Sequence, residues 1–169
     1  MDIMTILDYL IRGLSLGSIY AIIALGYTMV YGIAKMLNFA HGDVIMIGAY
    51  VALLSMTHAG MPVLPAVLIS VVACTVLGLL IERVAYKPLR NASSSLAVLI
   101  TAIGVSYLLQ NVALLIWGAD TKSFSNVISL PSLKLAGGSI VITGVTIVTI
   151  IGGILIMAGL MLFISKTKT

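Results

Sequence analysis

The chain has 169 residues, of which 61% are hydrophobic and only 8% are charged. A soluble domain carries about a quarter charged residues, so this composition excludes a water-soluble protein and predicts one that lies in lipid. The formal net charge is +4 and the basic residues are scattered, which argues against nucleic acid as a partner.

A first membrane helix is predicted at about residues 10–33. No charged residue lies between Arg12 and Lys35, which leaves 22 positions, enough to cross a hydrocarbon core of about 30 Å. This run is too long for the apolar part of a cleaved signal peptide, so we interpret it as a retained helix. Small residues at every fourth position predict a face for close helix packing, made of Gly13, Gly17 and Ala21.

A polar cluster follows within nine positions, made of Lys35, Asn38, His41, Gly42 and Asp43. Unpaired polar groups are costly in hydrocarbon, so such a cluster is expected to face water, protein or lipid headgroups. We interpret it as the lip or floor of a transport path, formed by a short loop or a broken helix. The alternative is a turn at the membrane surface. The cluster lacks the further carboxylates or histidines of a metal site, so no metal is predicted.

The next 38 residues contain no Asp, Glu, Lys or Arg. One straight helix of that length would measure about 57 Å, almost twice the thickness of the core, so the chain must turn. Gly60 and Pro62 mark the turn, which places helices at about 39–57 and 62–82. His58 then lies at the membrane surface, where we expect a structural or solvated histidine.

The densest charge in the chain follows this helix and predicts a cytoplasmic anchor, made of Glu82, Arg83, Lys87 and Arg90. Pro88 disfavours helical geometry at Lys87 and is expected to end the helix. A fourth helix is predicted at about 95–117, with Trp117 at the membrane interface. The amides of Gln110 and Asn111 lie within this span and are expected to bond a neighbouring helix or to line the path.

A fifth helix is predicted at about 139–164, after a polar connection. If the C-terminus is cytoplasmic, the inner segments hold six basic residues and the outer segments hold three. Because cytoplasmic segments are enriched in Lys and Arg, this asymmetry predicts an outer N-terminus and a cytoplasmic C-terminus. The chain is therefore predicted to be an all-α membrane protein, with about five transmembrane helices in a single domain over 1–169.

Four segments occur in the order GLSLGSIYAIIALGYTMVYGI, LNFAHGDVIMIGAY, IERVAYKPLR and LITAIGVSYLLQN. Together they closely resemble the permease subunits of branched-chain amino acid ABC importers, from Gly13 to Asn111 and more weakly beyond. NFAHGD followed by GAY, and ERVAY followed by a basic residue and Pro, are the specific signals. The resemblance implies a bacterial or archaeal inner-membrane protein that catalyses no reaction and carries no cofactor. It also implies a second permease subunit, cytoplasmic ATPase subunits that hydrolyse ATP, and a periplasmic binding protein that delivers leucine, isoleucine or valine.

Members of this family are usually nearly twice as long, and they continue into a cytoplasmic segment that docks on the ATPase. The sequence is therefore expected to be the N-terminal part of a permease. It contains no Gly-x-x-x-x-Gly-Lys phosphate loop, which agrees with ATP hydrolysis by partner subunits. The residues assigned to the substrate path are Asn38, His41, Gly42, Asp43, Gln110 and Asn111.

Two other functions stay open from the residues alone. One is an ion-coupled secondary transporter or channel, with His41 and Asp43 as a proton or cation site. The position of Asp43 near a predicted helix start, away from its centre, disfavours this function. The other is a membrane enzyme that uses the same two residues. On a helix they would point about 200° apart, which disfavours action on one substrate atom.

Overall fold

The computed structural model describes residues 3–35, 37–89, 95–124, 133–135 and 140–166. These residues form five α-helices: α1 (Ile3–Ala34), α2 (His41–Thr57), α3 (Val63–Ile81), α4 (Ser95–Trp117) and α5 (Gly144–Lys166). Among them, four are long and apolar enough to cross a membrane, and α2 is a shorter apolar helix. The prediction of a helical membrane protein with five helices is confirmed. The orientation of the two termini stays a prediction.

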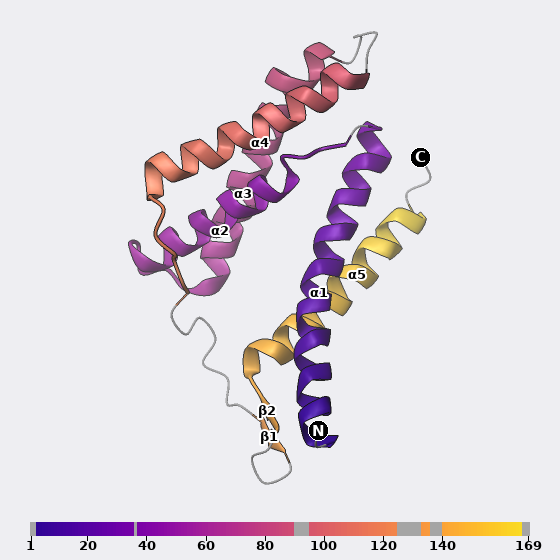
Figure 1. Cartoon of the computed structure of the whole chain (residues 1–169), viewed down its shortest axis with the longest axis vertical. Helices are drawn as coiled ribbons and strands as arrows, with labels where there is room; N and C mark the ends of the chain where they lie inside the picture. Colours follow the sequence, from indigo (N-terminus) through magenta and orange to yellow (C-terminus); the bar gives the residue numbers. More distant parts are fainter. Residues whose placement is uncertain (1–2, 36, 90–94, 125–132, 136–139, 167–169) are drawn as a thin grey trace. The chain divides into compact units, whose positions relative to one another are not determined.

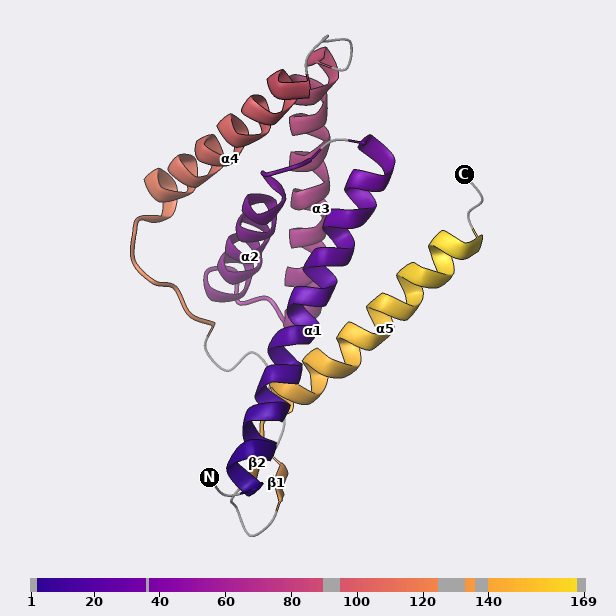
Figure 2. The ribbon, with the colours of Figure 1, turned by 45° about the vertical axis from the view of Figure 1, so that its right-hand side comes forward.

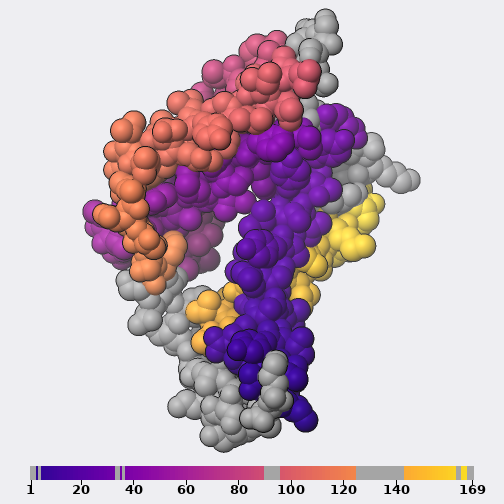
Figure 3. Space-filling model, in the orientation of Figure 1, coloured from indigo at the N-terminus to yellow at the C-terminus, as the bar shows by residue number. Residues whose placement is uncertain are grey.

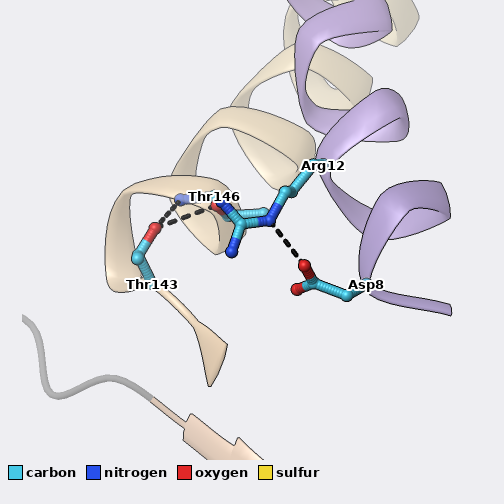
Figure 4. Close-up of polar contacts among 4 residues, drawn as sticks. All are labelled: Asp8, Arg12, Thr143 and Thr146. Atoms are coloured by element: carbon cyan, nitrogen blue, oxygen red, sulfur yellow. Dashed lines mark hydrogen bonds and ion pairs between the residues drawn. The ribbon is translucent and has the colours of Figure 1, made fainter. Parts of the chain in front are cut away.

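Helix α1 begins at Ile3, about seven residues before the predicted start. Asp8 and Arg12 are one helical turn apart, and Arg12 Nε lies 2.8 Å from Asp8 Oδ2. Both residues lie within α1, and the helix brings their side chains together one turn apart (Figure 4).

Helix α5 begins at Gly144, five residues after the predicted start. The preceding residues form strand β2 (Ile140–Ile142), which pairs antiparallel with β1 (Leu133–Leu135) in the segment predicted as a polar connection. The β-branched residues of β2 favour this extended conformation. Thr143 Oγ1 accepts a hydrogen bond of 3.3 Å from the Thr146 N–H, which caps α5 and fixes where it starts (Figure 4).

The chain stays helical beyond α3, as a π-helical turn (Glu82–Tyr86) and a 3₁₀ turn (Lys87–Leu89). Lys87 has φ −57° and ψ −42°, so the prediction that Pro88 keeps Lys87 out of helical geometry is wrong. The effect of proline on the preceding residue is a preference, and here the Lys87 N–H bonds the Glu82 carbonyl and holds the turn. The predicted anchor residues Glu82, Arg83 and Lys87 lie on this extension, and Arg90 lies outside the described residues.

The chain divides into two compact units, residues 1–29 with 126–169, and residues 30–125. In the first unit, α5 crosses α1 (Figure 2), and a Cβ placed on Gly153 would lie 3.2 Å from Ser18 Cβ. This close contact lets the two helices approach without a side chain between them.

The predicted packing face at Gly13, Gly17 and Ala21 does not make this contact. In the described part of the chain, a Cβ placed on Gly13 or Gly17 would meet nothing within 4 Å. The packing role of these residues therefore stays a prediction.

In the second unit, α2 packs antiparallel on α3, and α4 lies against α2 (Figures 1 and 3). Ser70 Oγ of α3 donates a hydrogen bond of 2.6 Å to the Gly48 carbonyl of α2. The buried apolar cluster is small and consists of Ile81, Tyr86 and Ala102, with partly buried side chains around it. Many large apolar side chains on the helices are exposed, which is the pattern of helices solvated by lipid.

Candidate functional site

The polar centre of the second unit is the carboxylate of Asp43, in the first turn of α2. Asp43 is only 8% exposed. One carboxylate oxygen accepts a hydrogen bond from Ser106 Oγ, and the other accepts one of 3.0 Å from Gln110 Nε2. Ser106 and Gln110 are four residues apart, so they share one face of α4. We call Asp43, Ser106 and Gln110 the Asp43 cluster.

Two contacts place the Asp43 cluster near the middle of the neighbouring apolar spans. Ser106 is the eleventh of the 22 residues in the span that ends at Trp117. The carbonyl of Val44, next to Asp43, lies 3.5 Å from Cys74 Sγ, and Cys74 is the twelfth of the 27 residues in the span that begins at Val63. Asp43 therefore lies in the first turn of α2, beside the middle of both neighbouring spans.

The partners of Asp43 in the described part of the chain are neutral donors. A carboxylate at this depth is costly unless it is hydrogen-bonded, and the two bonds from α4 provide this. The positive end of the α2 dipole favours a negative charge in the first turn, by about 0.3–1 kcal/mol at exposed sites. In the described part of the chain, Asp43 is therefore held by these two hydrogen bonds and by the start of α2.

Asn38 has a different position and different partners. Its Oδ1 accepts hydrogen bonds from Tyr86 Oη at 2.8 Å and from the Ala40 N–H at 3.1 Å. Its backbone carbonyl accepts one of 3.2 Å from the His41 N–H. Asn38 therefore holds the turn before α2 and joins it to the π-helical turn after α3.

The other residues assigned to the path are less enclosed. His41 is half-buried and Gly42 is exposed, both at the start of α2. Asn111 is exposed, and its Nδ2 donates a hydrogen bond of 2.7 Å to the Tyr107 carbonyl of its own helix. Of the predicted path residues, the structure thus joins Asp43 with Gln110 and leaves Asn111 outside the cluster.

Sequence reasoning missed Ser106 and Tyr86. The signal for Ser106 was its spacing, because a serine four residues before Gln110 continues the polar face of the same helix. Tyr86 has no comparable local signal. Its contact with Asn38 depends on the π-helical turn, which changes the direction of its side chain.

A second contact between α2 and α4 lies seven residues further along both helices. The rings of Tyr50 and Trp117 stack, with centroids 4.4 Å apart and planes at 5°. The pair Asp43 and Gln110 is 67 residues apart in sequence, and so is the pair Tyr50 and Trp117. Because the separation is the same, α2 and α4 run in the same direction in a fixed register.

Comparison with known proteins places these features in context. The family described as "Branched-chain amino acid transport system / permease component" matches residues 9–169. The chain is similar to the high-affinity branched-chain amino acid transport system permease protein BraD of Pseudomonas aeruginosa. The two are 42% identical over 174 residues, which cover 96% of this chain and 56% of the relative.

The chain is also similar to the permease protein LivH of the same type of transport system. The identity is 44% to LivH of Escherichia coli K12 and 43% to LivH of Salmonella typhimurium, over 135 residues that cover 75% of this chain and 42% of each relative. The chain thus spans about half the length of the curated relatives it matches. No solved structure matches it.

Proposed function

Since the chain belongs to the family of branched-chain amino acid transport system permease components, we propose that it forms part of the permease of an ABC importer for these amino acids. The observation that carries the proposal is the similarity to BraD over 96% of the chain. The helices and the Asp43 cluster between α2 and α4, in which Asp43 itself is buried, fit a protein that provides a polar route through lipid.

The partners follow from the same proposal. A second permease subunit completes the path, cytoplasmic ATPase subunits bind and hydrolyse ATP, and a periplasmic binding protein delivers the amino acid. The complex lies in the inner membrane, and this chain catalyses no reaction and needs no cofactor of its own. The relatives' names support the transported solute, because they state branched-chain amino acid transport.

The path is proposed to pass the Asp43 cluster. Transporter sites are often built where a helix starts or breaks at mid-membrane depth, because backbone and side-chain polar groups are available there. What supports this is that Asp43 lies in the first turn of α2 and bonds Ser106 and Gln110 near the middle of the α4 span. His41, Gly42 and Asn111 are proposed as flanking parts of the path, and Asn38 as the residue that shapes its turn.

The experiment is uptake of radiolabelled L-leucine by cells that lack their own leucine importers and express this chain with its partner subunits. We expect Asp43→Ala to reduce uptake per molecule at unchanged abundance, because it removes the carboxylate at the centre of the cluster. Thr75→Ala is the matched control, since this hydroxyl bonds only its own helix among the described residues and lies outside the proposed path. Uptake that does not depend on this chain would contradict the proposal.

One observation favours a second candidate, an ion-coupled transporter or channel. The Asp43 carboxylate lies beside the middle of two neighbouring apolar spans, with neutral partners among the described residues, and coupling-ion sites of secondary transporters are often near the bilayer midplane. From the sequence, the position of Asp43 near a helix start disfavours this function. The start of α2 lies beside the middle of the α3 and α4 spans, however, so a position at the start of α2 is compatible with it. We expect uptake to continue with an uncoupler at constant ATP. Loss of uptake under that condition would favour the second candidate.

A further inference from the structure

A cavity lies where α2 and α4 both end, beyond the stacked rings of Tyr50 and Trp117. Its volume is about 530 Å³, and both rings line it. Leu53, Leu54 and Ile116 form an apolar wall, and the charged side chain on its lining is Lys122. A second cavity of about 350 Å³ shares Tyr50, Leu53 and Lys122 with the first and adds Asp120.

The two charges at these cavities have opposite signs and lie two positions apart. Asp120 and Lys122 are exposed, and among the described residues neither forms an ion pair. The adjoining wall is aliphatic and aromatic. Across the two adjoining cavities, an ammonium acceptor (Asp120), a carboxylate partner (Lys122) and an apolar wall complement a small zwitterion with an apolar side chain. The volume also falls in the range of about 300–1,000 Å³ that is usual for small-molecule sites.

We propose that the two adjoining cavities together bind an apolar α-amino acid. Lys122 holds the carboxylate, Asp120 holds the ammonium group, and the side chain of the amino acid packs on Leu53, Ile116 and the two rings. The choice of an amino acid as the ligand rests on the proposed function. The existence of a site rests on the two cavities, their charges and their wall.

The position of the cavity relates it to the Asp43 cluster. The stacked rings lie seven residues along α2 and α4 from Asp43 and Gln110, which is about 10 Å on a helix. The larger cavity therefore lies at and beyond the rings, whereas the smaller one reaches Met46, about one helical turn from Asp43. The two cavities would be the place where a solute waits before it reaches the buried carboxylate.

Trp117 makes a direct test possible, because it is the single tryptophan of the chain and lines the cavity. The purified chain in lipid nanodiscs is titrated with L-leucine while tryptophan emission is recorded. We expect a saturable change. 4-Methylpentanoate, which lacks the ammonium group, and 3-methylbutylamine, which lacks the carboxylate, should each bind at least about tenfold more weakly, because each loses one charge-assisted contact.

Two variants test the assigned charges. Lys122→Gln and Asp120→Asn should each weaken L-leucine binding about tenfold, while Lys87→Gln, at the opposite end of α3, should leave it unchanged. Circular dichroism checks that each variant is folded. The titration of the unmodified chain with leucine and the two analogues tests the site even if a variant does not fold.

The failures of the two proposals can be told apart. An unchanged Trp117 signal up to about 10 mM leucine would overturn the cavity site, whereas leucine uptake in cells tests the permease function separately. Equal responses to leucine and 4-methylpentanoate, with no effect of Asp120→Asn, would overturn the zwitterion assignment. A response to phosphatidylglycerol in the nanodisc in place of leucine would show that Lys122 binds a lipid headgroup, and would also overturn it.

Discussion

Gly48→Ala should loosen the packing of α2 on α3, because two side chains of α3 lie directly against this residue. A Cβ placed on Gly48 would lie 2.6 Å from Cys74 Sγ and 3.1 Å from Ser70 Oγ. Favourable contacts between heavy atoms are about 3.5–4.0 Å, so the new methyl group is about 1 Å too close to the sulfur. Either the helices separate or both side chains of α3 rotate away.

The cost follows from the contacts that must change. Overpacking of this kind costs about 1–3 kcal/mol, and loss of the hydrogen bond from Ser70 Oγ to the Gly48 carbonyl costs about 1 kcal/mol more. Alanine is a better helix former than glycine by about 1 kcal/mol, which offsets the second cost. The expected net loss in the free energy of unfolding is therefore about 1–3 kcal/mol.

The assay is unfolding of the purified chain in mixed micelles with increasing dodecyl sulfate, followed by far-ultraviolet circular dichroism. Gly78→Ala on α3 is the matched control, since a Cβ there would meet nothing within 4 Å among the described residues. The double variant Gly48→Ala with Cys74→Ala should recover part of the loss, because it removes the sulfur from the clash. If Gly48→Ala is as stable as Gly78→Ala, the close approach of α2 and α3 is refuted.

Three other predictions use the same chain. Tyr86→Phe should lower the free energy of unfolding by about 0.5–1.5 kcal/mol, because it removes the hydrogen bond to the turn before α2. Gln110→Leu should lower it by about 1–3 kcal/mol, because it leaves one oxygen of Asp43 without its donor. In a cysteine-free chain, an introduced cysteine at Ser123 should react with an impermeant reagent from outside, and one at Lys87 only after permeabilisation. The reverse labelling would contradict the predicted orientation.

Matched variants separate these effects from nonspecific damage. Tyr107→Phe removes a hydroxyl from a tyrosine that is 61% exposed on α4, and should leave stability unchanged. Asn111→Leu changes the neighbour of Gln110 without touching Asp43. A loss of stability in either control equal to that in Tyr86→Phe or Gln110→Leu would show that the specific hydrogen bonds do not account for the effect.

The helices were predictable because the bilayer limits their length. A span needs about 20 apolar residues, so the charged and glycine-containing breaks in the sequence determine how many helices there are. The ends of the helices were less predictable where the neighbouring residues form an ion pair or a strand pair. Asp8 and Arg12 pair one turn apart within α1, and Ile140–Ile142 pair as a strand before α5 begins.

The candidate site was predictable only in part. The polar residues around Asp43 could be found from composition, since they interrupt an apolar sequence. Their depth could not, because it depends on the register of α2 against Ser106 and Cys74, which no local pattern encodes. Tyr86 depends on a π-helical turn, for which the sequence offers no periodic signal.

The break between α1 and α2 explains why Asn38 is needed for structure. Lys35 ends α1 with φ 55°, a left-handed conformation, and its N–H bonds the Tyr31 carbonyl at 2.8 Å. Residues 37–40 lie outside the helices, so their backbone groups need other partners where water is scarce. Asn38 supplies two of them, since its side chain accepts from the Ala40 N–H and its carbonyl accepts from the His41 N–H.

Substitutions at Asn38 should therefore act on folding and not on transport chemistry. Asn38→Leu removes the acceptor of two hydrogen bonds, those from Tyr86 and from the Ala40 N–H, and should reduce the abundance of the chain in the membrane. Asn38→Asp keeps an oxygen at the same position, so it should retain most of that abundance. Both effects are measured by immunoblot of membranes together with leucine uptake per molecule. Normal abundance of Asn38→Leu together with lost uptake would show that Asn38 contacts the transported solute. A purely structural role of Asn38 would then be wrong.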